Sequence, residues 1–249
     1  MQSSLEQSLQ VMANAFRKLE DQVPAPESTK HGNGFVFRYK EQLIEQAILQ
    51  KLAKAISGLA ASQVLLANGY AQEHATLNRI VDELGEDVFF LAAALTNDKL
   101  TPLHERFLAS FWAEEYSDPD DIVGTHKARD IVPRKKIRAY TMRVLGEGIE
   151  LSRATTTGNV LHKMYSGFVH GASPQIMELC VGNPPRFMLF GMTGTPRIRE
   201  HFDDSWNYHY RTLTAVTVAA KAFGDGGLVD AMYAYLDQFE EETGRTGKA

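Results

Sequence analysis

Two trios of residues share the spacing His-x3-Ser-x3-His, and their side chains are of the types that perform acid–base and phosphoryl-transfer chemistry. The trios are His162, Ser166 and His170, and His201, Ser205 and His209. On an α-helix a step of four residues stays near one face, so each trio would form a polar stripe along its helix. If the two stripes meet, four imidazoles and two hydroxyls line one interior pocket.

His170 is the residue that we expect to act as a general acid or base. It lies near the end of its predicted helix, where the helix dipole favours a protonated imidazole. Tyr165 or Ser166 would be its hydrogen-bond partner, and His162 or His209 its complement in proton transfer. The alternative is that these histidines only bond backbone or carboxylate groups where helices cross.

Three charged residues, Arg79, Glu83 and Asp87, follow one another at steps of four in a predicted helix over residues 71–96. The second half of this helix is apolar on every side, which is typical of a central helix. Charges beside such a segment must be solvated or paired, because an unpaired buried charge is costly. They form either an ion-pair network that fixes helix register, or a site in which Glu83 and Asp87 face the histidines.

A basic segment lies between His126 and Arg143, and its single acid is Asp130. Its cations are Lys127, Arg129, Arg134, Lys135, Lys136, Arg138 and Arg143. Arg134, Lys135 and Arg138, together with Arg79, are our candidates for binding a phosphate group or nucleic acid. The alternative is a solvated helix face. The net charge of -5 argues against a nucleic-acid footprint over the whole surface.

The elements that must position these residues are almost all helices, because apolar residues recur with a period of 3.6 along nearly the whole chain. The sequence predicts an all-α fold, a multi-helix bundle without significant β-sheet. The expected helices span about 4–21, 37–68, 71–96, 101–116, 133–146, 159–170, a short stretch after Pro174, 187–192, 196–223 and 228–242. Residues 1–34 would be an N-terminal helix with a hinge loop, and residues 35–249 one helical-bundle domain.

Composition sets further bounds on the protein. A single cysteine, Cys180, cannot form an internal disulfide, which favours a reducing compartment and a cytoplasmic location. The N-terminus lacks the charged head and apolar run of a signal peptide. The longest apolar stretch, residues 88–95, is far short of the roughly 20 residues that a membrane span needs, so we expect no membrane segment.

Several catalytic classes are excluded by their motifs. None of the eight histidines has Glu three positions before it, which argues against a ferritin-like di-iron site. The chain has no phosphate-binding glycine loop, no His-Glu-x-x-His, no Gly-x-Ser-x-Gly and no cysteine cluster. We therefore expect no cofactor. A divalent metal held by the histidines with Glu83 or Asp87 stays open as an alternative.

One short motif resembles a known family. The run Tyr165-Ser166-Gly167-Phe168-Val169-His170-Gly171, with Arg79-x3-Glu83 earlier in the chain, resembles a bacterial all-helical family of unknown function. The likeness spans about residues 48–181. That family is loosely similar to the HEPN helical superfamily, many members of which are RNA-cleaving toxins or defence proteins. The HEPN motif Arg-x4-6-His is absent, so the resemblance assigns no catalytic arginine.

These observations lead to one leading hypothesis and two alternatives. The leading hypothesis is a cytoplasmic helical bundle whose internal His/Ser/Tyr/Glu pocket binds or cleaves a nucleotide or RNA phosphate, as a defence or toxin-type protein would. The first alternative is a non-enzymatic interaction or regulatory module that works as a homodimer. The second is a metal-dependent hydrolase.

Overall fold

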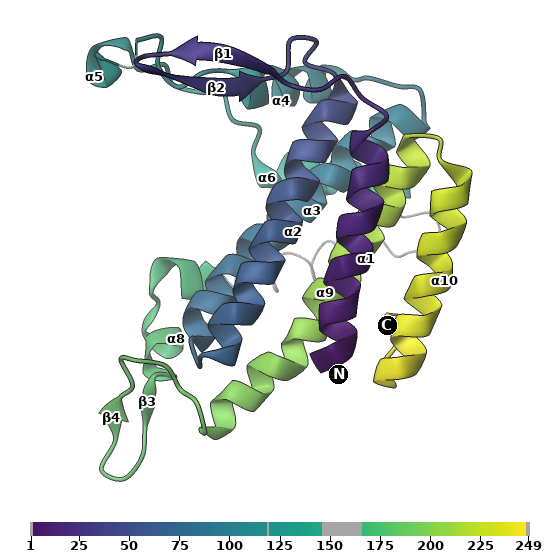
Figure 1. Cartoon of the computed structure of the whole chain (residues 1–249). Coiled ribbons are helices and arrows are strands. Elements are labelled where there is room, and N and C mark those ends of the chain that lie inside the picture. The colour runs from purple at the N-terminus through teal and green to yellow at the C-terminus, as the bar shows by residue number, and fades with distance from the viewer. Residues whose placement is uncertain (1, 119, 146–165, 248–249) are drawn as a thin grey trace.

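The computed structural model describes residues 2–118, 120–145 and 166–247 of the chain, and it confirms the predicted all-α class. The helices are α1 (Gln2–Glu20), α2 (Ile44–Ala67), α3 (Ala71–Thr96), α4 (Pro102–Trp112), α5 (Ile122–Thr125), α6 (Arg134–Leu145), α8 (Ser173–Met177), α9 (Pro196–Ala222) and α10 (Gly226–Thr243). Residues 166–170 are also helical. Figure 1 shows the long helices side by side, with small hairpins at the two ends of the bundle.

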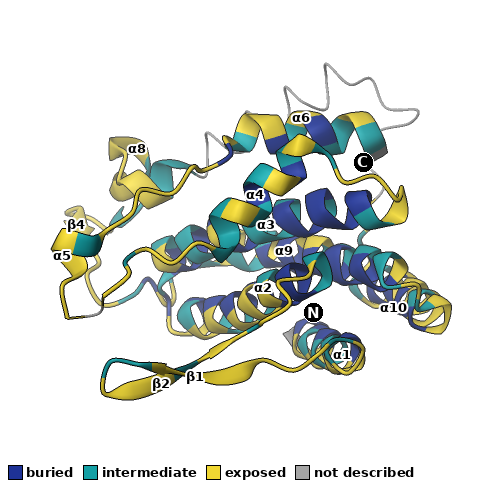
Figure 2. Ribbon diagram, turned by 90° about the horizontal axis from the view of Figure 1, so that it is seen from above, coloured by how far each residue is buried: buried dark blue, intermediate teal, exposed yellow. Residues whose placement is uncertain are grey.

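Helix α9 is the element around which the bundle is built, because it packs against α1, α2, α3 and α10. Helix α3 packs against α2 and α9, and α6 covers another part of its surface. The end of α3, from Phe90 to Ala94, is buried on every side, as its all-apolar sequence predicts. Figure 2 shows the buried residues of α2, α3 and α9 turned toward one another.

The N-terminal helix α1 shares the core of the bundle. Met12 and Leu19 of α1 are fully buried, and both belong to the same apolar cluster as Leu52 of α2 and Val216 of α9. Burying a large apolar side chain stabilises a fold by about 1.5–3 kcal/mol. Residues 2–20, which the sequence set apart with a hinge loop, therefore contribute to the core of the helices that follow.

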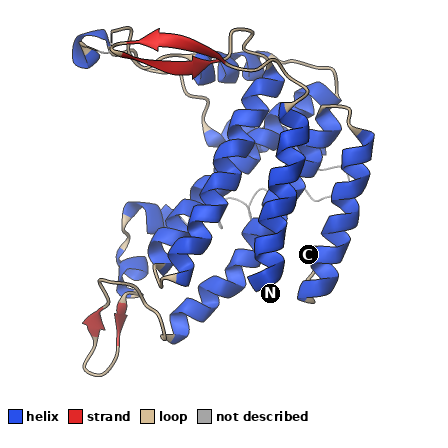
Figure 3. Ribbon diagram, viewed as in Figure 1, coloured by secondary structure: helices blue, strands red, loops and turns tan. Residues whose placement is uncertain are grey.

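Two small antiparallel hairpins interrupt the helical pattern (Figure 3). Strands β1 (Glu27–His31) and β2 (Gly34–Arg38) pair with each other, so the second helix begins at Ile44 and not near Phe37 as predicted. Aromatic and β-branched residues in β2 favour a strand, and Gly32, at φ 54°, permits the tight turn before it.

The second hairpin also replaces a predicted helix. Strands β3 (Cys180–Val181) and β4 (Arg186–Phe187) pair, and residues 187–192 form no helix, contrary to the sequence prediction. Gly191 has φ 92° and its Cα approaches the carbonyl oxygen of Asn68 so closely that a Cβ atom would lie 2.5 Å from it. The amide of Met192 donates to the carbonyl oxygen of Gly69 at 2.7 Å. This contact fixes the entry to α9 against the α2–α3 turn.

No helix in the described part of the chain is both long enough and apolar enough to cross a lipid bilayer.

Candidate functional site

His209 is fully buried at the centre of a polar network that joins three helices. The hydroxyl of Ser8 in α1 donates to the carbonyl oxygen of Leu5 at 2.7 Å. Its oxygen lies 2.6 Å from Nδ1 of His209 and therefore accepts the Nδ1 proton. Nε2 then accepts from the side-chain amide of Gln63 in α2 at 2.8 Å. Burial, followed by the influence of His74, lowers the pKa of His209 to about 3, so this imidazole is neutral.

His74 of α3 is the second fully enclosed imidazole of this network. Its Nδ1 donates to the carbonyl oxygen of Ser62 at 3.0 Å, so Nε2 is the acceptor. The side-chain amide of Asn78 donates to Nε2 at 2.9 Å, and the hydroxyl of Ser205 lies 3.4 Å from it. Burial lowers the pKa of His74 to about 4. We call His74, His209 and their partners Ser8, Ser62, Gln63, Asn78 and Ser205 the histidine network.

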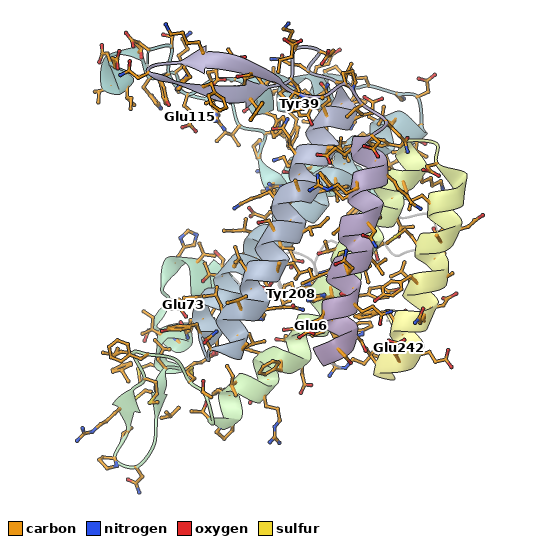
Figure 4. All side chains as sticks on the ribbon, in the orientation of Figure 1. Glu6, Tyr39, Glu73, Glu115, Tyr208 and Glu242 are labelled. Carbon is orange, nitrogen blue, oxygen red and sulfur yellow. The ribbon has the colours of Figure 1, made fainter. Side chains whose placement is uncertain are left out.

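The network lies inside the bundle and at the level of Tyr208, which Figure 4 shows between α1 and α2. The rings of His74 and Tyr208 meet edge to face with centroids 6.4 Å apart. His74 and His209 expose at most 1% of their surface. Both imidazoles are neutral, bonded at both nitrogens and sealed from solvent, which is the geometry of a structural polar contact between helices.

His201, the first member of the second trio, is less buried than His74 and His209. Its Nε2 lies 3.7 Å from a carboxylate oxygen of Glu178, and its ring meets the ring of His74 edge to face at 6.1 Å. The ring of Phe168 lies 5.9 Å from that of His201. The helical residues 166–170 therefore reach the second trio through an aromatic contact.

Ser166 and His170, the two members of the first trio that the structure describes, take no part in the histidine network within the described residues. His170 is exposed and Ser166 is half-buried, and neither forms a hydrogen bond with residues 201–209 in the described ranges. His162 and Tyr165 lie outside the described residues. Of the six residues named as catalytic candidates, the structure places His209 in a buried network, His170 at the surface and Glu83 among charged residues of α3.

The partners of His209 and His74 were not predicted from the sequence. His74 and Asn78 repeat the step of four that marked the other trios, so this pair carried a detectable signal. Ser8 and Gln63 carried none, because a serine and a glutamine on amphipathic helices look like ordinary surface residues.

The charged residues of α3 form an ion-pair cluster with α2 and α6, as one of the two interpretations predicted. Asp87 is fully buried, and Nζ of Lys51 lies 2.8 Å from one of its carboxylate oxygens. The guanidinium of Arg134 donates to both carboxylate oxygens. Arg79 pairs with Glu83 one turn away. Burial would lower the pKa of Arg134, but Asp87 and neighbouring carboxylates outweigh burial and raise it.

Helix α6 divides the predicted phosphate-binding residues between two faces. Arg134 and Arg138 lie on the face toward α3, where Arg138 donates to Glu86 at 2.7 Å. These arginines and Arg79 pair with carboxylates inside the fold, so most of their positive charge is neutralised there. Lys135 is exposed on the other side of the helix.

The outward face of α6 borders a surface cleft of about 380 Å³. The cleft is lined by Thr101, Pro102, Leu103, Lys136, Ala139, Tyr140 and Arg143. Lys136 and Arg143 flank Tyr140 along one face of α6, and neither cation forms a salt bridge with any carboxylate of the described residues. The guanidinium of Arg143 lies 5.4 Å from the Tyr140 ring centroid. We call this the α4–α6 cleft.

The described residues contain no group of three or more His, Cys, Asp or Glu side chains placed to hold a metal ion. His201 and Glu178 form only a pair. The described part of the chain therefore offers no arrangement that favours the metal-dependent hydrolase.

No protein-family model matches this chain, and none of the curated proteins or solved structures with which it was compared matches it.

Proposed function

We propose that this protein binds the phosphate groups of a nucleotide or of RNA at the α4–α6 cleft. The observation that carries the proposal is the pair of cations, Lys136 and Arg143, that line one cleft beside Tyr140, neither of which forms a salt bridge in the described residues. Guanidinium and ammonium groups are the usual ligands of phosphate in proteins, so two such groups beside one cleft favour a phosphate ligand.

Tyr140 is held rigidly at the base of this cleft. Its ring meets His104 edge to face at 4.7 Å and Phe90 at 5.3 Å, and only 7% of the residue is exposed. His104 is itself fixed, because its Nε2 donates to the carbonyl oxygen of Phe90 at 3.1 Å and Thr101 bonds its Nδ1. A ring that is already fixed at the cleft lowers the conformational entropy lost when a ligand binds.

The histidine network argues against catalysis by its buried imidazoles. A general acid or base must reach the proton that it transfers and needs a pKa near the working pH. His209 and His74 are enclosed, and burial lowers the pKa of each to about 3 and about 4. The reading of the buried stripe as a device for helix register is therefore favoured. The family that residues 165–171 resemble is loosely similar to the HEPN superfamily, many members of which cleave RNA. The lone Cys180 fits a cytoplasmic setting.

A binding experiment tests this proposal. Fluorescence anisotropy with labelled single-stranded RNA compares the wild type with Lys136→Gln/Arg143→Gln. The control, Lys18→Gln/Lys54→Gln, removes the same charge from exposed sites on α1 and α2. We expect the cleft variant to bind about tenfold more weakly at low salt and its salt slope to fall by about 2. Equal loss in both variants would mean that only net charge matters.

A cleavage assay separates binding from catalysis. His170 is exposed, so His170→Ala should fold normally and leave both RNA binding and any RNA cleavage unchanged. If His170→Ala binds RNA like the wild type but loses a cleavage activity, catalysis belongs to His170 and the binding-only proposal is wrong.

A second candidate function is a protein-interaction module that works as a homodimer. Its support is a set of exposed apolar residues on the hairpins at the two ends of the bundle (Figure 1). Phe35 and Phe37 of β2 are 67% and 60% exposed, and Phe190 after β4 is 90% exposed. Light scattering on Phe35→Ser/Phe37→Ser and on Phe190→Ser tests it, because loss of a dimer in either variant would identify the contact.

A further inference from the structure

A second cleft, distinct from the α4–α6 cleft, lies where α2, α3, α4 and the segment leading into α6 meet. Its volume is about 260 Å³, and its lining includes Lys51, Phe107, Phe111, Arg129 and Ile131. Ligand pockets for drug-sized molecules usually start near 300 Å³, so this cleft suits a small molecule. It shares with the ion-pair cluster its floor residues Asp87 and Arg134.

The cations of the floor are largely balanced by carboxylates, since Arg134 also lies within 4.0 Å of Glu83 and Glu86. Asp87 is fully buried, and both Lys51 and Arg134 approach its carboxylate. An ammonium group has three N–H donors, and within the described residues Asp87 is the one carboxylate within 4 Å of Nζ of Lys51. The ammonium group of Lys51 therefore retains N–H donors for a ligand in the cleft, although only 16% of its side chain is exposed.

Aromatic and aliphatic side chains form the walls. Nζ of Lys51 lies 5.4 Å from the ring centroid of Phe107 and 4.8 Å from that of Phe111. Ile131 borders the cleft and is 70% exposed, so its apolar surface lacks cover. An apolar body placed against these residues would remove that surface from water.

A second cation stands at the cleft in a pair that is easily exchanged. A guanidinium nitrogen of Arg129 lies 2.8 Å from a carboxylate oxygen of Glu115, and the two side chains are 37% and 58% exposed. Glu115 lies beside the β1–β2 hairpin, away from the core of the bundle (Figure 4). Ion pairs between exposed side chains contribute little to stability, so a ligand carboxylate could replace Glu115 at small cost.

We propose that this cleft binds a small carboxylic acid as its monoanion, with the carboxylate between Lys51 and Arg129 and an apolar body against Phe107, Phe111 and Ile131. A single charge is favoured over a phosphate dianion for two reasons. Asp87 repels a second negative charge at the floor, and most of the lining is apolar. This binding is independent of phosphate binding at the α4–α6 cleft.

The test uses benzoate as the probe and NMR chemical shifts of the intact chain as the readout. We expect saturable shifts at residues of the cleft with a Kd of about 1 mM, a normal affinity for a ligand of this size. Benzamide, which has the same ring without the charge, should bind about tenfold more weakly, because charge-assisted hydrogen bonds are the stronger ones. Equal binding of benzamide, or no saturable shift with benzoate, overturns the proposal.

Three variants locate the site. Ser110→Phe fills the cleft without removing a charge and should abolish benzoate binding. Arg129→Gln should weaken it about fivefold, since one charge-assisted bond is lost at an exposed position. Lys54→Gln, an exposed change on α2 outside the cleft, is the matched control and should bind as the wild type does. If Ser110→Phe remains folded and still binds benzoate, the ligand sits elsewhere and the proposal is wrong.

Discussion

Nδ1 of His209 lies 2.6 Å from Oγ of Ser8, and this hydrogen bond joins α9 to α1 across 201 positions of sequence. The same imidazole reaches α2 through Gln63. A buried hydrogen bond contributes modestly to stability, but a buried group that loses its partner costs more. The pairing therefore specifies how three helices meet rather than supplying most of the free energy of folding.

We predict that Ser8→Ala lowers the free energy of unfolding by about 1–3 kcal/mol, because Nδ1–H of His209 would lose its buried acceptor. Urea unfolding followed by circular dichroism measures the change. Ser3→Ala, an exposed change in the same helix, is the control and should stay within about 0.5 kcal/mol of the wild type. Similar effects of the two changes would mean that the Ser8 hydroxyl is replaceable.

Stability should fall as the pH drops below about 6.5. The folded-state pKa values of His209 and His74 are about 3 and about 4, below the ordinary value of 6.5, so the unfolded chain binds protons first. The stabilisation is complete above the unfolded pKa and is lost progressively toward the folded one. Between pH 6 and pH 5 each of these two histidines should remove about 1.4 kcal/mol per pH unit at most, and the contribution of His74 fades as the pH approaches its folded-state pKa of about 4.

Unfolding free energies measured at several pH values test this dependence. In His209→Gln one contribution is missing, while those of His74 and of His104, whose pKa burial also lowers, remain, so the slope that the histidines contribute should fall by less than half. His170→Gln, at an exposed histidine, should retain the wild-type slope. An unchanged slope in His209→Gln would show that carboxylates dominate the acid response.

Asp87→Ala should be strongly destabilising, by about 3–5 kcal/mol, because Lys51 and Arg134 would lose the carboxylate that both of them bind. Urea unfolding measures this loss. Asp130→Ala provides the contrast, since the Asp130–Arg106 pair is exposed and its removal should change stability little. Equal effects of the two substitutions would contradict the central place of Asp87 in the ion-pair cluster.

Two glycines should respond to alanine in opposite directions. Gly191→Ala places a methyl group against the carbonyl oxygen of Asn68 at a positive φ, and it should cost about 1–3 kcal/mol. Gly85→Ala, inside α3 with open space around it, should stabilise the protein by about 0.5–1 kcal/mol. Melting temperatures of both variants provide the check, and a stable Gly191→Ala would show that the loop before α9 adjusts freely.

The sequence by itself determined where most helices lie and which residues share a helix face. Period-3.6 spacing placed α3 and α9 within a residue or two of their observed bounds, because this pattern is local. It placed His201, Ser205 and His209 on one face for the same reason. The hairpin of residues 27–38 escaped prediction, since five-residue strands give too short a pattern to compete with the neighbouring helices.

Only the tertiary structure decided what each polar face meets. Ser8 and Gln63 are the partners of His209. The cations on the inward face of α6 pair with Asp87 and Glu86, whereas Lys136 and Arg143 line the α4–α6 cleft at the surface. Which helix faces pack together depends on the summed burial of apolar surface across the whole chain. Local spacing cannot supply that sum, so a polar stripe can be read from sequence while its partners cannot.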